Sequence, residues 1–77
     1  MFVNLHNLEP GQALYTLHVG DDPDSWIEEV DVVASRSARL GEIVAAADLD
    51  DFDAKYVFGI VDQSAGETLF DGQMEMK

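Results

Sequence analysis

Cysteine is absent from this sequence, and basic residues are scarce. Without thiols the chain can form neither a disulfide nor a thiolate metal site, which excludes a small disulfide-bonded secreted scaffold and favours a reducing compartment. The 77 residues include only four Lys and Arg, at positions 36, 39, 55 and 77. Direct binding to nucleic acid is therefore not expected, because phosphate contacts require clustered basic side chains.

Long apolar runs are missing as well. No window approaches the roughly 18 consecutive apolar residues of a membrane helix. Residues 1–8 have neither the basic start nor the long apolar stretch of a signal peptide. The sequence thus predicts a cytoplasmic protein that does not bind membranes.

What the sequence does contain is one acidic domain spanning residues 1–77. A chain of this size buries only about 60% of its unfolded surface, so marginal stability is expected. Its hydrophobic fraction of 47% is typical of a folded protein, although the net charge of −12 opposes compaction. We expect the apolar residues to prevail and the chain to fold.

Two strands are expected in the first half of the chain. Residues 13–19 alternate between apolar and polar positions, as in a half-buried strand. Residues 26–34 are ambiguous, because Asp22 and Pro23 would cap a helix there. As a strand, the same segment places Val30 on an inner face and Glu29 and Asp31 outside. Its many β-branched residues favour the strand.

One helix is expected in the middle of the chain. Its apolar stripe follows the spacing i, i+3, i+4 and i+7, at Leu40, Ile43, Val44 and Ala47. Ser37 is the expected N-cap. A run of acids follows the stripe, so these carboxylates are expected at the C-terminal end of the helix, where the macrodipole is already negative.

The last third of the chain predicts a second hairpin. Residues 56–61 are apolar on both faces, which is typical of a central strand covered on both sides or of a strand at an interface. Residues 68–76 alternate again, with Phe70 and Met74 on one face and Asp71 on the other. The predicted fold is α+β, with two antiparallel hairpins and one packed helix in the order ββαββ.

Catalytic and metal-binding signatures are missing. Starting at Asp48, the acidic run would put Phe52 where a calcium loop needs an oxygen ligand and Asp53 where it needs glycine. His6 and His18 have no metal-ligand spacing and are expected to be surface side chains. No nucleophile elbow or Gly-rich phosphate loop is present. We therefore expect a protein that is not an enzyme and uses no cofactor.

The acids themselves are the remaining functional signal. On a strand, Glu29 and Asp31 would lie about 6.6 Å apart on one face. DNA carries a phosphate every ~3.4 Å along each strand, so spaced carboxylates can present a comparable line of charge to a basic groove. The expected partner-binding acids are Asp21, Asp22, Asp24, Glu29, Asp31, Asp48, Asp50, Asp51 and Asp53. The expected aromatic anchors are Trp26, Phe52 and Tyr56.

In size, single-domain organisation, lack of cysteine and excess of Asp and Glu, the chain resembles the small acidic proteins by which phages inhibit bacterial defence, including anti-CRISPR proteins that imitate DNA. These proteins share no motif, so the resemblance transfers no functional residue. It implies an inhibitor that acts in the host cytoplasm and occupies the DNA-binding surface of a partner such as a CRISPR effector complex.

Two other classes of protein fit the same composition. Asp is more frequent than Glu and Lys is rare, which resembles halophile proteins whose acidic surfaces need salt to screen self-repulsion. The chain also fits an interaction subunit, either an antitoxin or immunity protein that caps a basic enzyme or a homodimer formed through exposed strand edges.

Overall fold

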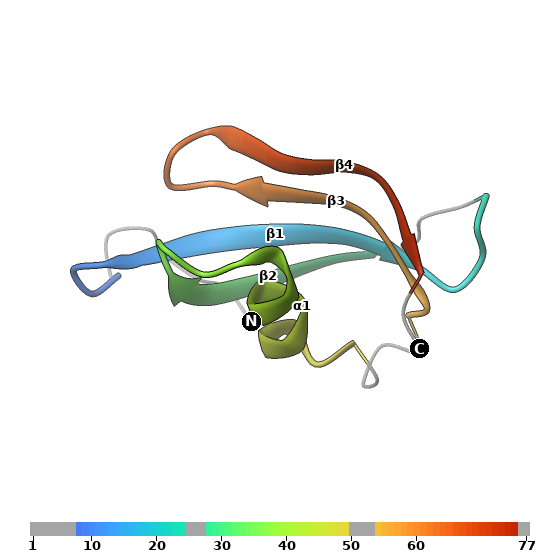
Figure 1. The fold of residues 1–77 in the computed structure, drawn as a ribbon, viewed down its shortest axis with the longest axis horizontal. Helices are drawn as coiled ribbons and strands as arrows, with labels where there is room; N and C mark the ends of the chain where they lie inside the picture. The colour runs from blue at the N-terminus through green and yellow to red at the C-terminus, as the bar shows by residue number, and fades with distance from the viewer. Residues whose placement is uncertain (1–7, 25–27, 50–53, 76–77) are drawn as a thin grey trace.

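The computed structural model describes residues 8–24, 28–49 and 54–75, and its elements follow the predicted order ββαββ. They are β1 (Gln12–Gly20), β2 (Glu28–Ser35), α1 (Leu40–Ala47), β3 (Tyr56–Asp62) and β4 (Glu67–Glu75) (Figure 1). The prediction of a small α+β fold is confirmed. Among the described residues, no helix has the length and apolar character needed to cross a bilayer.

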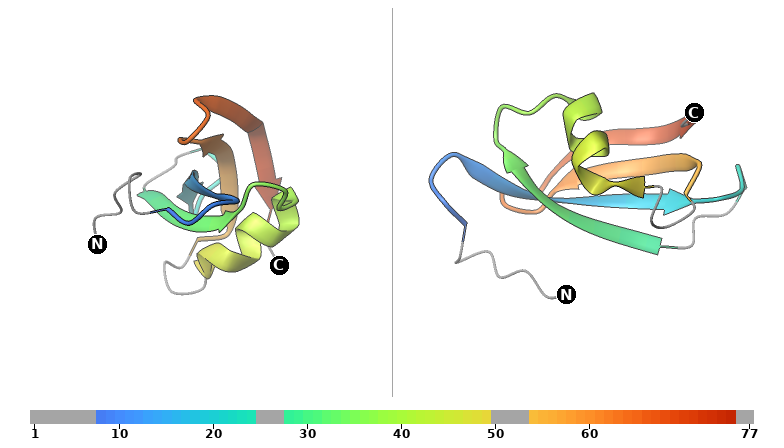
Figure 2. Two further views of the ribbon diagram at one scale, coloured as in Figure 1. Left: turned by 90° about the vertical axis from the view of Figure 1, so that its left-hand side faces the viewer. Right: turned by 90° about the horizontal axis from the view of Figure 1, so that it is seen from below.

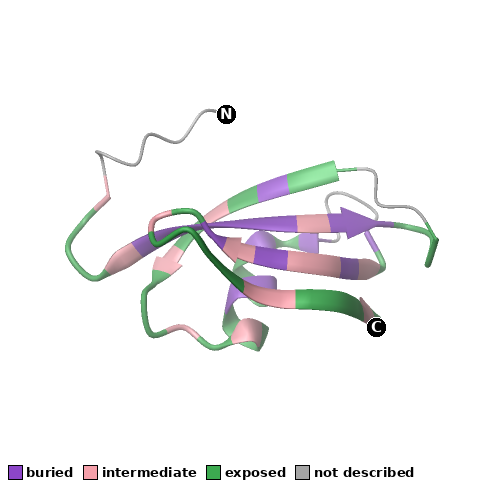
Figure 3. Cartoon of the chain, turned by 90° about the horizontal axis from the view of Figure 1, so that it is seen from above, coloured by how far each residue is buried: buried purple, intermediate pink, exposed green. Residues whose placement is uncertain are grey.

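The sheet has the strand order β2-β1-β3-β4, and every neighbouring pair is antiparallel. The two predicted hairpins, β1–β2 and β3–β4, are therefore joined into one sheet by the pairing of β1 with β3. The connection through α1 carries the chain from one edge of the sheet to the other side of β1. β2 and β4 form the edges, and the buried positions concentrate on β1 and β3 (Figure 3).

Residues 28–35 form a strand, so the helical alternative for this segment is wrong. β2 pairs with β1 along its whole length, from Gln12 opposite Ser35 to Val19 opposite Glu28. The pairing places the β-branched Val30 in the core and leaves Asp31 exposed, as the strand interpretation expects. Tertiary pairing with β1 thus decides a segment whose local signals conflict.

The helix covers one face of the sheet, over β1 and β2 (Figure 2). The predicted stripe is confirmed as its packing surface, because Ile43, Val44 and Ala47 are buried and Leu40 is half-buried against them. Most of the other core side chains come from the inner faces of β1 and β3. Those of these two strands are Ala13, Tyr15, Leu17, Val19, Val57 and Ile60.

Strand β1 is buried on both faces, not on one as its alternation predicts. Leu14 and Thr16, which point away from the helix, are only 6% and 4% exposed. The turn after β3 lies against this end of β1: the Gln63 backbone N–H donates to the Leu14 carbonyl (2.8 Å) and the Leu14 N–H donates to Ser64 Oγ (3.0 Å). The turn therefore supplies cover that the strand's own pattern does not indicate.

The predicted N-cap of the helix is wrong. The helix begins at Leu40 with Arg39 at the N-cap position, where the Arg39 backbone N–H donates to Glu42 Oε1 (2.9 Å). Ser37 instead lies in the turn after β2, with its hydroxyl 2.9 Å from Ser35 Oγ. The Glu42 carboxylate, one turn inside the helix, thus satisfies the Arg39 N–H, as in a capping box.

The helix ends in an acid, as expected. Asp48 is the C-cap and adopts a left-handed conformation (φ 50°), which Asp tolerates better than most residues. Its N–H donates to the Ala45 carbonyl (3.3 Å). Asp50, Asp51 and Asp53, the other acids of this run, lie outside the described residues.

Candidate interaction site on the outer sheet face

The face of the sheet opposite the helix, called here the outer face, carries an open groove of about 430 Å³. Its floor is largely apolar and consists of Phe58, Gly59 and Val61 from β3 together with Phe70 from β4. The polar side chains at its rim are His18, Asp24, Thr68 and Asp71. Because α1 packs only on the inner face, the apolar outer side of β3 stays partly open.

Irregular strand pairing shapes this groove. The register of β3 shifts between Val57 and Gly59 against both neighbouring strands. Against β1 the extra residue is Phe58, whereas against β4 the extra residue lies in β4, where Gly72 and Gln73 face Phe58 alone. A second shift, between Ile60 and Val61, interrupts the alternation predicted for residues 68–76. Such bulges redirect side chains locally, and here Phe58 and Phe70 line the same groove.

Two glycines of the groove lie beneath ring side chains. A Cβ atom at Gly59 would lie 3.9 Å from the His18 ring, so the imidazole lies over this glycine. A Cβ atom at Gly72 would lie 3.5 Å from Phe70 Cζ, so the Phe70 ring packs over that residue in the same way.

A third aromatic ring extends the apolar surface. Tyr56 is half-buried and stacks on Phe58, with ring centroids 6.2 Å apart and an interplanar angle of 18°. Of the three predicted anchors, Tyr56 thus lies beside the groove. Trp26 and Phe52 lie outside the described residues. The sequence analysis missed Phe58 and Phe70 as site residues, although the run that is apolar on both faces was a signal for Phe58.

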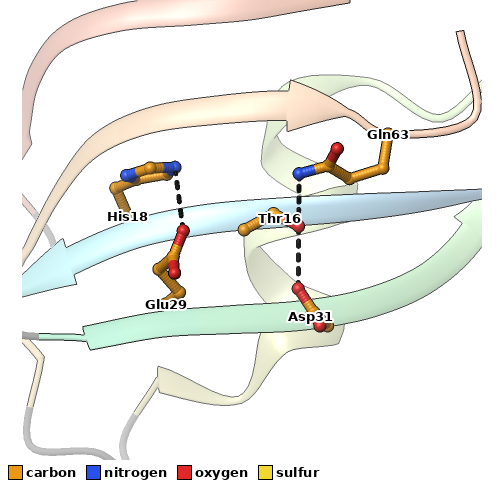
Figure 4. Close-up of polar contacts among 5 residues, drawn as sticks. All are labelled: Thr16, His18, Glu29, Asp31 and Gln63. Carbon is orange, nitrogen blue, oxygen red and sulfur yellow. Dashed lines mark hydrogen bonds and ion pairs between the residues drawn. The ribbon is translucent and has the colours of Figure 1, made fainter. Parts of the chain in front are cut away.

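Two carboxylates of β2, those of Glu29 and Asp31, lie next to side chains of β1 on the outer face (Figure 4). Thr16 Oγ1 donates to Asp31 Oδ1 (2.7 Å) and accepts a hydrogen bond from Gln63 Nε2 (3.1 Å). His18 Nε2 lies 3.6 Å from Glu29 Oε2. Asp31 is therefore held by Thr16 of the neighbouring strand β1, and Glu29 lies beside the half-buried His18 imidazole, which is 31% exposed at the groove.

The loop after β1 brings further acids to this end of the sheet. Asp21, Asp22 and Asp24 are exposed, and Asp22 Oδ1 accepts a hydrogen bond from the Asp24 backbone N–H (2.8 Å). Only Asp24 of the three lines the groove. Asp71 of β4, which was not among the predicted site residues, also lines the groove.

The predicted acids are therefore not all brought together. Asp24, Glu29 and Asp31 lie on or beside the outer face, whereas Asp48 lies at the end of the helix on the inner face. No protein-family model, curated protein or solved structure matches this chain. The arrangement of its own side chains is thus the basis for a functional proposal.

The buried polar groups of the described residues have structural partners. The Asp62 carboxylate accepts hydrogen bonds from the Ser64 and Ala65 N–H groups (2.9 and 3.1 Å), and the Tyr15 hydroxyl donates to the Ser35 carbonyl (2.7 Å). In this part of the chain, no buried side-chain polar atom lacks a hydrogen bond, and no three His, Asp or Glu side chains are grouped to hold a metal ion. These groups stabilise the fold.

Proposed function

We propose that this chain is an acidic binding protein, without enzymatic activity, that inhibits a nucleic-acid-handling protein by occupying its basic DNA-binding surface, as an anti-CRISPR protein of the DNA-mimic type does. The observation that carries the proposal is the pair of carboxylates on the outer face beside an apolar groove, where Asp31 accepts a hydrogen bond from Thr16 and Glu29 lies 3.6 Å from His18 Nε2. Fixed anions next to apolar surface are what a folded imitation of a phosphate backbone requires.

Electrostatics supports this function at two levels. The net charge of −12 attracts a basic partner over distances of about a Debye length, ~8–10 Å at physiological salt, and raises the rate of encounter. At contact, residues 29 and 31 present carboxylates at the ~6.6 Å repeat of alternate strand positions. A mobile anionic tail would lose conformational entropy on binding, and a carboxylate already held by Thr16 loses less.

A salt-adapted acidic domain is the second candidate. It is favoured by the acids that lie away from the outer face, since Glu42 and Asp48 are exposed on the helix and Glu9 is exposed before β1. In such a protein the charge would serve hydration everywhere on the surface, and no face would be specialised for a partner.

Displacement by DNA tests the proposed function. The immobilised protein is incubated with a nuclease-treated lysate of its natural host at low salt, and bound proteins are eluted with duplex DNA. The expected result is elution of a nucleic-acid-binding protein which, once purified, no longer binds its DNA when this chain is added. A partner that stays bound in excess DNA, or retains full DNA binding, would contradict the proposal.

A pair of variants with equal net charge locates the binding surface. Glu29→Gln combined with Asp31→Asn removes two outer-face charges while keeping an acceptor for Thr16. Glu9→Gln combined with Glu67→Gln removes two exposed charges that do not line the groove. Only the first double variant should require a several-fold higher concentration to inhibit DNA binding by the partner to the same extent. Equal losses would show that total charge, and not this face, determines binding.

A further inference from the structure

The groove on the outer face has a chemistry of its own, distinct from the pair of carboxylates on β2. Its floor is formed by the half-buried Phe58, Val61 and Phe70, and its rim includes the exposed Asp24 and Asp71. We propose that this groove receives an arginine side chain of the partner protein, with the guanidinium against the aromatic rings and the rim carboxylates. The inference rests on the proposed function, because it names the partner group that the site would bind.

The composition of the groove matches both parts of an arginine side chain. The aliphatic stem of arginine is apolar and gains from contact with a surface such as Val61. Its guanidinium is planar, weakly hydrated and attracted to the faces of aromatic rings, and Phe58 and Phe70 provide such rings. The volume of about 430 Å³ lies within the ~300–1,000 Å³ range of ligand-binding pockets.

The charges at the rim select a cation. Asp24 and Asp71 both line the groove and come from different elements, one from the β1–β2 loop and one from β4. A neutral apolar group would desolvate these carboxylates without a partner for them, and an anion would be repelled. Arg36, Arg39 and Lys55 do not line the groove, so none of these basic residues neutralises it from within.

Arginine fits better than lysine for a geometric reason. A guanidinium offers five donors in one plane and can bond to a carboxylate while its face lies on a ring. A lysine ammonium is a compact, strongly hydrated charge that loses more hydration free energy over an apolar floor. The partner group expected in this groove is therefore an exposed arginine of a basic nucleic-acid-binding surface, where arginine is common.

Peptide titration tests this inference without the partner. The probe is the blocked pentapeptide acetyl-Gly-Gly-Arg-Gly-Gly-amide, added to the ¹⁵N-labelled full chain, with its citrulline counterpart as a neutral control of the same shape. The expected result is a saturable shift of the backbone amides of Gly59, Val61 and Gly72. The citrulline peptide should leave the chemical shifts of these amides unchanged. A third peptide, with lysine in place of arginine, should bind several-fold more weakly than the arginine peptide.

Variants of the groove separate ring contact from charge. Phe58→Leu keeps an apolar side chain but removes the ring, and we expect the arginine peptide to bind about two- to fivefold more weakly. Asp71→Asn keeps the shape and removes the charge, with an expected loss of up to about fivefold. Glu67→Gln, an exposed position on the same strand outside the groove, is the matched control and should change affinity by less than about 1.5-fold.

The outcomes distinguish this inference from the proposed function. Equal binding of the arginine and citrulline peptides, or unchanged affinity in both Phe58→Leu and Asp71→Asn with their spectra still folded, would overturn the arginine site. If the same variants still displaced DNA from the partner fully, the proposed function would stand and only the groove would be excluded from the contact. Failure of DNA displacement by the unmodified chain would instead contradict the function.

Discussion

At the scale of single residues, the acids of this protein have different roles that their one-letter code does not reveal. Asp31 is exposed but held by Thr16, and Asp22 binds the backbone of its own loop. Asp62 is buried at the end of β3 and closes the turn that covers β1. In the sequence the three carboxylates look alike, and the bond from Thr16 to Asp31, 15 residues apart, leaves no local pattern there.

Tyr15 is the residue whose ionisation is most clearly affected by the fold. Burial raises its pKa above the ordinary value of 10.0, the nearby Asp62 carboxylate raises it further, and Arg36 opposes both effects. The unfolded chain therefore loses this proton first as the pH rises. The contribution of the protonated Tyr15 to the free energy of unfolding is therefore complete below pH 10. It decreases as the pH rises from 10 to the pKa of the folded state.

Tyr15→Phe should lower the free energy of unfolding at pH 7 by about 0.5–1.5 kcal/mol, because the Ser35 carbonyl loses its hydrogen-bond donor. The difference between the two proteins should narrow above pH 10, since only the natural protein has a Tyr15 hydroxyl to ionise on unfolding. Urea denaturation at pH 7 and pH 10.5 measures both effects, with Tyr56→Phe as the control for losing a half-buried phenol. A gap that stays constant with pH would contradict the assignment.

At the scale of elements, the sequence predicts most of what strong periodicity can specify. The alternation of β1 and the stripe of α1 correctly predict that Leu17 and Ile43 lie in the core. The boundaries and irregularities escape prediction: Ser37 forms a local bond instead of capping, and the bulge at Phe58 depends on pairing with β1. The groove is lined by Phe58 of β3 and Phe70 of β4, so it could not be predicted from residues 56–61 alone.

Ile43→Ala should destabilise the protein by about 2–5 kcal/mol, because Ile43 is fully buried between the helix and the sheet. Gly41→Ala in the same helix is the matched control. Position 41 is exposed with no neighbouring atom within 4 Å of a new Cβ, so alanine should be neutral or stabilise by up to ~1 kcal/mol.

Thermal and urea denaturation monitored by circular dichroism measures both variants. If Ile43→Ala is unfolded at 25 °C, Ile43→Val gives a smaller, measurable loss of about 0.5–1.5 kcal/mol. A change below ~0.5 kcal/mol for Ile43→Ala would mean that α1 does not pack as described.

At the scale of the whole molecule, the net charge of −12 acts in two opposite directions. Within one molecule the acids repel each other and weaken the compact state, and salt relieves this repulsion. Between the molecule and a basic partner the same charges attract, and salt weakens that attraction. The composition alone predicts both effects, whereas the side of the molecule that meets a partner depends on the sheet placing Asp24, Glu29 and Asp71 around one face.

Salt should therefore change stability and binding with opposite signs. Between about 20 mM and 500 mM NaCl the Debye length falls from roughly 20 Å to roughly 4 Å, so the melting temperature should rise by a few degrees while partner affinity falls at least tenfold. Circular dichroism should show the folded protein already at 20 mM salt. The variant with Glu9→Gln and Glu67→Gln should show a smaller rise in melting temperature but the same fall in affinity. A chain that is unfolded at 20 mM and folds only in molar salt would instead identify the acidity as salt adaptation, because an inhibitor in an ordinary cytoplasm has to fold before it meets its target.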